Sequence, residues 1–183
     1  LGLQPEAVVT SGGASLFFAA PGAPSPFGGV NAGLGTGTYP FTAPAYVASG
    51  AFTVEFWMRP TATNTIPISF GAGNVGTTSL WLRTEGFGFN TGNGDIWGAA
   101  PPPLNAWTHV VAKFPTLGSS SGARLFLNGV EQTLTQRYGP GPNPGAYASR
   151  TAYLGSFGAG AFQFPGALAE LAFYPSTTDP AVI

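Results

Sequence analysis

Few side chains in this sequence could carry out acid–base or nucleophilic chemistry. Glycoside hydrolysis, for example, uses two carboxyl groups that face each other across a sugar. The carboxylates are Glu6, Glu55, Glu85, Asp95, Glu131, Glu170 and Asp179. Glu55 and Glu170 fall in predicted strands and could approach each other. The alternative is that each is a strand residue hydrogen-bonded within a sheet or paired with Arg59, Arg83 or Lys113. We favour this structural interpretation because buried carboxylates are usually paired.

His109 is the only histidine, and there is no cysteine. A Ser-His-Asp triad would need a nucleophile elbow of the Gly-x-Ser-x-Gly type, which the Gly-Ser-Phe-Gly of residues 155–158 does not provide. Zinc sites usually take several His or Cys ligands. We therefore predict no catalytic residue, no bound metal and no cofactor, with His109 as a hydrogen-bonded structural residue.

Aromatic and amide side chains could instead form a carbohydrate-binding surface, because aromatic rings stack on sugar faces and amides hydrogen-bond to hydroxyl groups. Two glycine-rich segments, residues 85–97 and 138–147, are the least core-like places for such residues. The alternative for each aromatic residue is a place in the core. The predicted ligand-binding residues are Phe87, Phe89, Asn90, Asn93 and Trp97 in the first segment and Tyr138, Asn143 and Tyr147 in the second.

The low charge of the chain limits its partners. Charged residues make up 7% of the 183 residues and the net charge is −1, against about 25% charged residues in an ordinary soluble domain. A chain with no basic field is not expected to bind nucleic acid. No apolar run approaches the roughly 20 residues that cross a bilayer, so we expect no membrane insertion. A nearly neutral surface associates readily, which favours a domain in an assembly; a neutral extracellular domain is the alternative.

The elements that would position these residues are short β-strands. Residues 52–60 alternate between apolar side chains and polar or charged ones, as in a strand with one face in the core. Residues 106–114 form a second long strand, and Asn128-Gly129 is a strong hairpin signal. Further strands are predicted at residues 7–9, 15–19, 45–48, 65–70, 79–84, 86–90, 95–97, 123–127, 130–134, 151–155 and 165–174. Pro67 suggests an edge or a bulge.

Short strands separated by turn signals predict an antiparallel sandwich or barrel. We expect a single domain over residues 1–183, in which residues 1–40 supply opening strands and a Gly/Pro-rich loop.

Five motifs, in this order, resemble the laminin G-like branch of the concanavalin A-like lectin/glucanase superfamily. They are FTVEFWMRP at residues 52–60, WTHVV at 107–111, RLFLNGV at 124–130, LG at 154–155 and FPGALAELAFY at 164–174. The resemblance covers about residues 40 to 183. It implies a jelly roll of two curved antiparallel sheets, one convex and one concave.

Departures from the family pattern bear on function. In several related domains an aspartate helps to hold calcium, and Ala169 stands at that position here. Hard cations need oxygen ligands, so we expect no tight calcium site. Relatives with glucanase activity place their acids on one strand as Glu-x-Asp-x-x-Glu, a cluster that this sequence lacks.

We therefore predict an all-β antiparallel β-sandwich, or jelly roll, that performs no chemistry. It would recognise a glycan or a receptor at an extracellular, cell or virion surface. The first alternative is a structural subunit or decoration protein of a viral particle or surface assembly, whose partners are neighbouring subunits. The second is a polysaccharide-active hydrolase. The same architecture serves many unrelated functions, so the fold does not choose between them.

Overall fold

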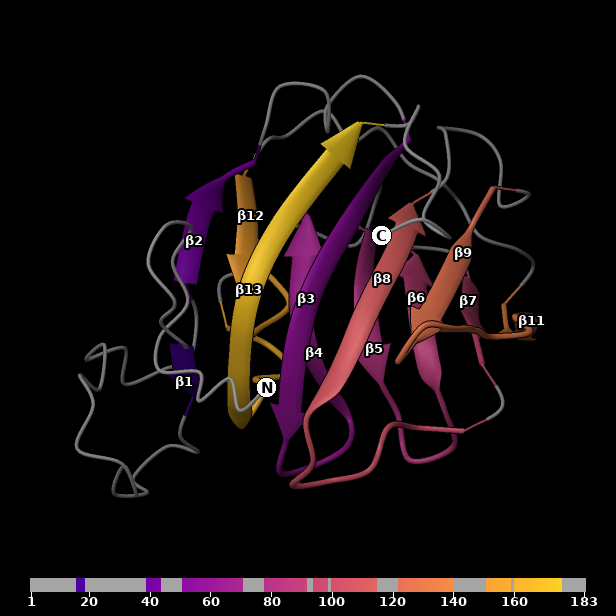
Figure 1. The fold of residues 1–183 in the computed structure, drawn as a ribbon, viewed down its shortest axis with the longest axis horizontal. Coiled ribbons are helices and arrows are strands. Elements are labelled where there is room, and N and C mark those ends of the chain that lie inside the picture. Colours follow the sequence, from indigo (N-terminus) through magenta and orange to yellow (C-terminus); the bar gives the residue numbers. More distant parts are fainter. Residues whose placement is uncertain are drawn as a thin grey trace.

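The fold is a sandwich of two β-sheets (Figure 1). The structure, a computed structural model, describes residues 16–18, 39–43, 51–70, 78–91, 94–98, 100–114, 122–139, 151–158 and 160–175. These residues contain thirteen strands and no helix, and every strand pair among them is antiparallel. The predicted antiparallel β-sandwich is confirmed. No described helix is long and apolar enough to cross a membrane.

The first sheet has six strands and crosses the front of the molecule in Figure 1. In spatial order they are β1 (Leu16–Phe18), β13 (Gly166–Pro175), β3 (Phe52–Pro60), β8 (Thr108–Phe114), β9 (Arg124–Leu127) and β10 (Val130–Glu131). The long strand predicted at residues 52–60 is therefore β3, and it lies between β13 and β8 at the centre of this sheet.

The second sheet has seven strands and lies behind the first in Figure 1. In spatial order they are β11 (Thr135–Tyr138), β7 (Gly94–Trp97), β6 (Phe87–Thr91), β5 (Thr78–Leu82), β4 (Thr65–Phe70), β12 (Thr151–Leu154) and β2 (Tyr39–Thr42). The pairing of β4 with β5 shifts between Thr65 and Ile68. This irregularity contains Pro67, as the missing N–H of a proline would favour.

The core lies between the two sheets and is rich in phenylalanine. The inner face of β3 carries Phe52, Val54, Phe56 and Met58, all of them buried. The Phe52 ring stacks on Phe114 of its own sheet, with centroids 4.8 Å apart, and meets Phe70 of the other sheet edge-on at 4.9 Å. Alternation along the strand therefore places the apolar face against the opposite sheet.

The turn at Asn128-Gly129 forms the predicted hairpin between β9 and β10. The two residues have φ angles of 51° and 77°, and Val130 pairs with Leu127 directly across the turn. A two-residue turn with both φ angles positive is the type I′ that matches strand twist. The strands predicted at residues 7–9 and 45–48 lie outside the described residues.

Candidate functional site

Two of the predicted ligand-binding residues lie in the core. Phe87 and Phe89 are 0% and 2% exposed, and the Phe89 ring centroid lies 5.1 Å from that of Phe114 on the opposite sheet. Residues two apart in a strand share a face, so the inner face of β6 holds both rings. Their burial corrects the prediction that they form a binding surface.

Asn90 and Trp97 lie on the outer face of the seven-stranded sheet. Gly88 alternates with the two buried phenylalanines and pairs with Trp97 across β6 and β7. Asn90, two residues after Gly88, shares that face and is half-buried. The structure therefore brings these two predicted residues together. Outside the described part of the chain lie Asn93, Asn143, Tyr147 and the side chain of Tyr138.

A row of three residues crosses this outer face. Trp81 of β5 pairs with Gly88 of β6, which pairs with Trp97 of β7. Because Gly88 has no side chain, nothing from the middle strand separates the two indoles. Arg83 contacts both of them, with its Cζ 3.9 Å from the Trp81 ring centroid and 4.7 Å from the Trp97 centroid. Such cation–π contacts contribute about 0.5–2 kcal/mol each.

Two glycines allow Trp97 to lie this close to β6. A Cβ atom on Gly86 would lie 2.2 Å from Cδ1 of Trp97, and one on Gly88 would lie 2.3 Å from its Cα. Side chains at either position would therefore displace Trp97. Trp97 is 7% exposed, so it supports Arg83 and offers no free ring face to a ligand.

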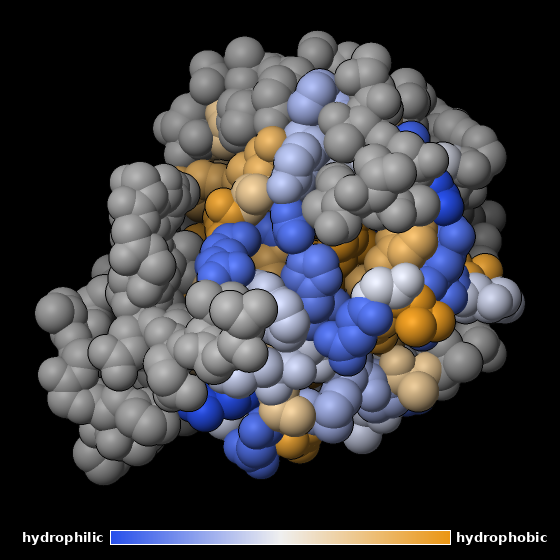
Figure 2. All heavy atoms as spheres, in the orientation of Figure 1, coloured by the Kyte–Doolittle hydropathy of each residue, from blue (hydrophilic) through white to orange (hydrophobic). Residues whose placement is uncertain are grey.

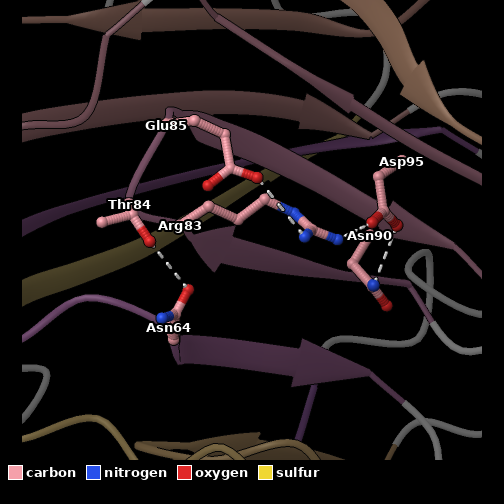
Figure 3. Close-up of polar contacts among 6 residues, drawn as sticks. All are labelled: Asn64, Arg83, Thr84, Glu85, Asn90 and Asp95. Carbon is pink, nitrogen blue, oxygen red and sulfur yellow. Dashed lines mark hydrogen bonds and ion pairs between the residues drawn. The ribbon is translucent and has the colours of Figure 1, made fainter.

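Polar contacts also hold Arg83 in place (Figure 3). The carboxylate of Asp95, whose side chain is 5% exposed, forms an ion pair with Nη2 of Arg83. Asn90 Nδ2 donates a hydrogen bond to Asp95 Oδ1 at 2.9 Å. Glu85 Oε1 lies 3.8 Å from Arg83 Nη1, and its side chain is 55% exposed. A buried carboxylate is tolerated when it is paired and hydrogen-bonded, so Asp95 anchors the guanidinium at the sheet.

Phe162 extends the aromatic surface from a distant part of the chain. Its ring centroid lies 4.8 Å from that of Trp81, and the residue is 47% exposed. Its φ angle is 50°, in a region that bulky residues seldom adopt. Strained conformations of this kind gather at functional sites. We call Trp81, Arg83, Trp97 and Phe162 the Trp–Arg platform.

The loop around Phe162 is fastened to β4. The N–H of Ile66 donates to the carbonyl oxygen of Phe162, and the N–H of Gly155 donates to that of Pro67, both at 2.8 Å. The Ser69 hydroxyl donates to the carbonyl oxygen of Ser156 at 2.9 Å. These bonds hold the backbone of the loop that carries Phe162, so less backbone entropy is lost when a ligand binds.

The sequence holds partial signals for the two platform rings that are not among the eight predicted ligand-binding residues. Trp81 stands between Leu80 and Leu82, so alternation places it on the face opposite two core residues. The Gly-Ala repeat of residues 158–161 before Phe162 indicates a loop, although the buried Phe164 follows two residues later. Neither signal shows that the two rings meet.

Two N–H groups of the platform are buried without a hydrogen-bond partner. They are Trp81 Nε1 and Arg83 Nε. A buried donor left unpaired costs about 1–3 kcal/mol. Because both atoms are buried, neither is open to a ligand in this arrangement of the platform.

A second polar cluster lies on the outer face of the six-stranded sheet. Glu55 of β3 accepts a hydrogen bond from the Tyr174 hydroxyl at 2.6 Å, and its other oxygen lies 2.8 Å from His109 Nε2. The rings of Trp57 and His109 lie 5.0 Å apart. Hydrophilic residues gather over the middle of this face in Figure 2. The partners of Glu55 thus come from β13 and β8, as expected for a carboxylate hydrogen-bonded within a sheet, rather than from Arg59, Arg83 or Lys113.

Glu170 does not share this arrangement. It is exposed, has a φ angle of 54° and lies where the pairing of β13 with β3 shifts, between Ala169 and Ala172. Among the described residues, no group of three or more His, Cys, Asp or Glu could hold a metal ion. Ala169 is buried. The expectation that no tight calcium site exists stays a prediction.

Comparison with known structures supports this architecture. The chain is 18% identical to a heptameric pentraxin from Limulus polyphemus over 79% of this chain and 72% of the other, with a TM-score of 0.53. It is 17% identical to the CBM40 of the Ruminococcus gnavus IT-sialidase bound to α2,3-sialyllactose, over 72% and 79%, with a TM-score of 0.52. It is 16% identical to domains LG4-5 of the mouse laminin α1 chain, over 79% and 41%, with a TM-score of 0.55. At these identities the likeness shows the fold alone.

Sequence comparison shows the family. No curated protein sequence matches the chain. The sequence model of the Laminin_G_3 family, described as the concanavalin A-like lectin/glucanases superfamily, matches residues 34–183. The five motifs, the two antiparallel sheets and this match agree, and the chain belongs to the laminin G-like domains of the concanavalin A-like lectin/glucanases superfamily.

Proposed function

We propose that this domain is a non-catalytic recognition module that binds glycans through the Trp–Arg platform. The observation that carries the proposal is Phe162, an exposed ring held beside Trp81 in a strained backbone conformation. Membership of a lectin/glucanase superfamily supports a carbohydrate ligand. The R. gnavus CBM40, which shares the fold, has been solved with sialyllactose.

The chemistry of the platform suits a sugar. Aromatic rings cover the apolar face of a pyranose, and nearby polar groups bind its hydroxyls. Such groups lie at two neighbouring turns, where the Thr84 hydroxyl is 3.4 Å from Asn64 Oδ1 and both residues are exposed (Figure 3). Glu85 and the half-buried Asn90 add a carboxylate and an amide. The platform thus combines a stacking surface with hydrogen-bonding groups at its rim.

In this proposal the bound glycan is not cleaved. A hydrolase needs two carboxyl groups that reach one sugar. Asp95 is buried and engaged by Arg83 and Asn90. Glu55 lies on the six-stranded sheet, away from the platform, and is engaged there by His109 and Tyr174. The protein should release no reducing sugar from any polysaccharide. Such release would contradict this part of the proposal if it disappeared when one carboxylate was replaced by an amide.

We place the domain at an extracellular, cell or virion surface, with a glycan or glycosylated receptor as its partner. A second candidate function is that of a subunit in a surface assembly. The 7% of charged residues favours it, because a nearly neutral surface associates readily. Val130, which is 64% exposed at the β9–β10 hairpin, would be one contact for a neighbouring subunit.

The test compares Phe162→Ala with Leu104→Ala. Both remove an exposed apolar side chain, 47% and 43% exposed respectively, and Leu104 lies in the connection that precedes β8. A glycan array identifies the strongest ligand, and calorimetry measures its affinity. Stacking on nucleic-acid bases contributes about 1–3 kcal/mol, so Phe162→Ala should weaken binding about 5- to 150-fold. Leu104→Ala should leave the affinity unchanged, and Phe162→Trp should retain binding.

Equal affinity of Phe162→Ala and wild type would refute the platform as the site. If the protein binds no glycan but sediments as an assembly, and if Val130→Asp disrupts that assembly, the results support a subunit in a surface assembly instead.

A further inference from the structure

Described charged side chains of both signs lie at the platform. Among the charged side chains that the structure describes on the outer face of the seven-stranded sheet, Arg83 is the cation and Glu85 and Asp95 are the anions. One positive and two negative charges leave a net charge of −1. Among the described charges at this surface, the anions thus outnumber the cation by one.

Arg83 is not free to act as a receptor for a carboxylate. Arginine binds carboxylates best through two parallel N–H groups. Nη2 of Arg83 is held by Asp95, and Nε is buried. The two indole rings contact the guanidinium as well. An acidic sugar would thus have to compete with Asp95 or Glu85 for the guanidinium. Displacement of Asp95 would leave a buried carboxylate without its cation.

Glu85 is the charge that an incoming ligand meets. Its side chain is 55% exposed, whereas that of Asp95 is 5% exposed. The Arg83 guanidinium contacts both the Glu85 carboxylate, 3.8 Å from Nη1, and the Trp81 ring, whose centroid lies 3.9 Å from Cζ. A second negative charge placed beside the ring would be repelled, whereas the hydroxyl of a neutral sugar could donate to the carboxylate.

We infer that the Trp–Arg platform takes uncharged glycans and that Glu85 excludes acidic ones, an inference that rests on the proposed function. The ligand class differs here from that of the R. gnavus CBM40, whose sialyllactose is acidic. At 17% identity the two chains share a fold, and the charges that select a ligand are set by individual side chains.

The experiment uses glycans in matched neutral and acidic pairs. The array carries oligogalacturonates beside their methyl esters, and sialylated beside desialylated oligosaccharides. The neutral member of each bound pair should bind more tightly to the wild type. Glu85→Gln should raise the ratio of acidic to neutral affinity about fivefold, the effect of one unit charge about 4 Å away in bulk water. High salt should reduce the difference between variant and wild type.

Glu131→Gln is the matched control. Glu131 is also a half-exposed carboxylate beside an arginine, with Oε1 2.8 Å from Nε of Arg124 and a side chain that is 47% exposed. It lies on the other sheet, so its neutralisation should leave the ratio unchanged.

The outcomes separate this inference from the proposed function. If an acidic glycan binds the wild type at least as tightly as its neutral partner, and Phe162→Ala weakens both, the charge argument is overturned and the platform stands. If no glycan binds, or if Phe162→Ala has no effect, the proposed function fails and the inference fails with it.

Discussion

Gly88→Ala should destabilise the protein by about 3 kcal/mol, because β6 and β7 leave no room for a side chain at this position. The added Cβ would lie 2.2 Å from the carbonyl oxygen of Ile96 and 2.3 Å from Cα of Trp97. Both are backbone atoms of the paired strand, so neither can rotate away. Overpacking of this kind typically costs about 1–3 kcal/mol. We expect a cost at the upper end of this range, because the clash can be relieved only if β6 and β7 separate.

Urea unfolding followed by tryptophan fluorescence measures this loss. For a chain of this size, about 3 kcal/mol corresponds to a fall in Tm of about 6–12 °C. The matched control is Gly98→Ala, just beyond β7, whose added Cβ would lie 3.3 Å from Cβ of Gln132 and 3.6 Å from the carbonyl oxygen of Phe87. Its free energy of unfolding should change by less than about 1 kcal/mol.

The same variant links packing to binding. Displacement of Trp97 would remove one of the two rings that contact Arg83, so glycan affinity should also fall in conditions where Gly88→Ala remains folded. A Gly88→Ala protein whose free energy of unfolding lies within about 0.5 kcal/mol of wild type would refute the close approach of the two strands.

Two further predictions concern stability. Tyr174→Phe removes a 2.6 Å hydrogen bond to the half-buried Glu55 and should lower the free energy of unfolding by about 1–2 kcal/mol, measured by chemical unfolding. If the effects of Tyr174→Phe and Glu55→Gln simply add in the double variant, the two side chains do not stabilise each other and this prediction is wrong. A calcium chelator should leave Tm unchanged, because Ala169 supplies no ligating oxygen from its side chain and a native-state ligand must raise stability. A fall of several degrees would reveal a calcium site built from other oxygens.

Local patterns were sufficient to predict the fold class. The alternation of residues 52–60 depends only on neighbours in the sequence, and β3 follows it on its core face. The same holds for Asn128-Gly129, whose positive φ angles suit these two residue types in any hairpin. Because backbone conformation at these places is decided locally, the two long strands and the hairpin were predictable.

The candidate site was predictable only in part. Residues 85–97 contain Asn90 and Trp97 on the outer face of the seven-stranded sheet, yet Phe87 and Phe89 in the same segment are core residues. Alternation shows which residues share a face, and it does not show which face another sheet will cover. In a chain with so many aromatic residues, ring chemistry alone cannot separate a core side chain from a surface one.

The sequence by itself determined the two long strands, the hairpin and the family. The tertiary structure alone decided which rings meet. Phe162 reaches Trp81 through a loop fastened to β4, and Glu55 meets Tyr174 across 119 positions of the chain. Such contacts depend on strand register and on the path of loops, which follow from the packing of the whole domain and from no local pattern.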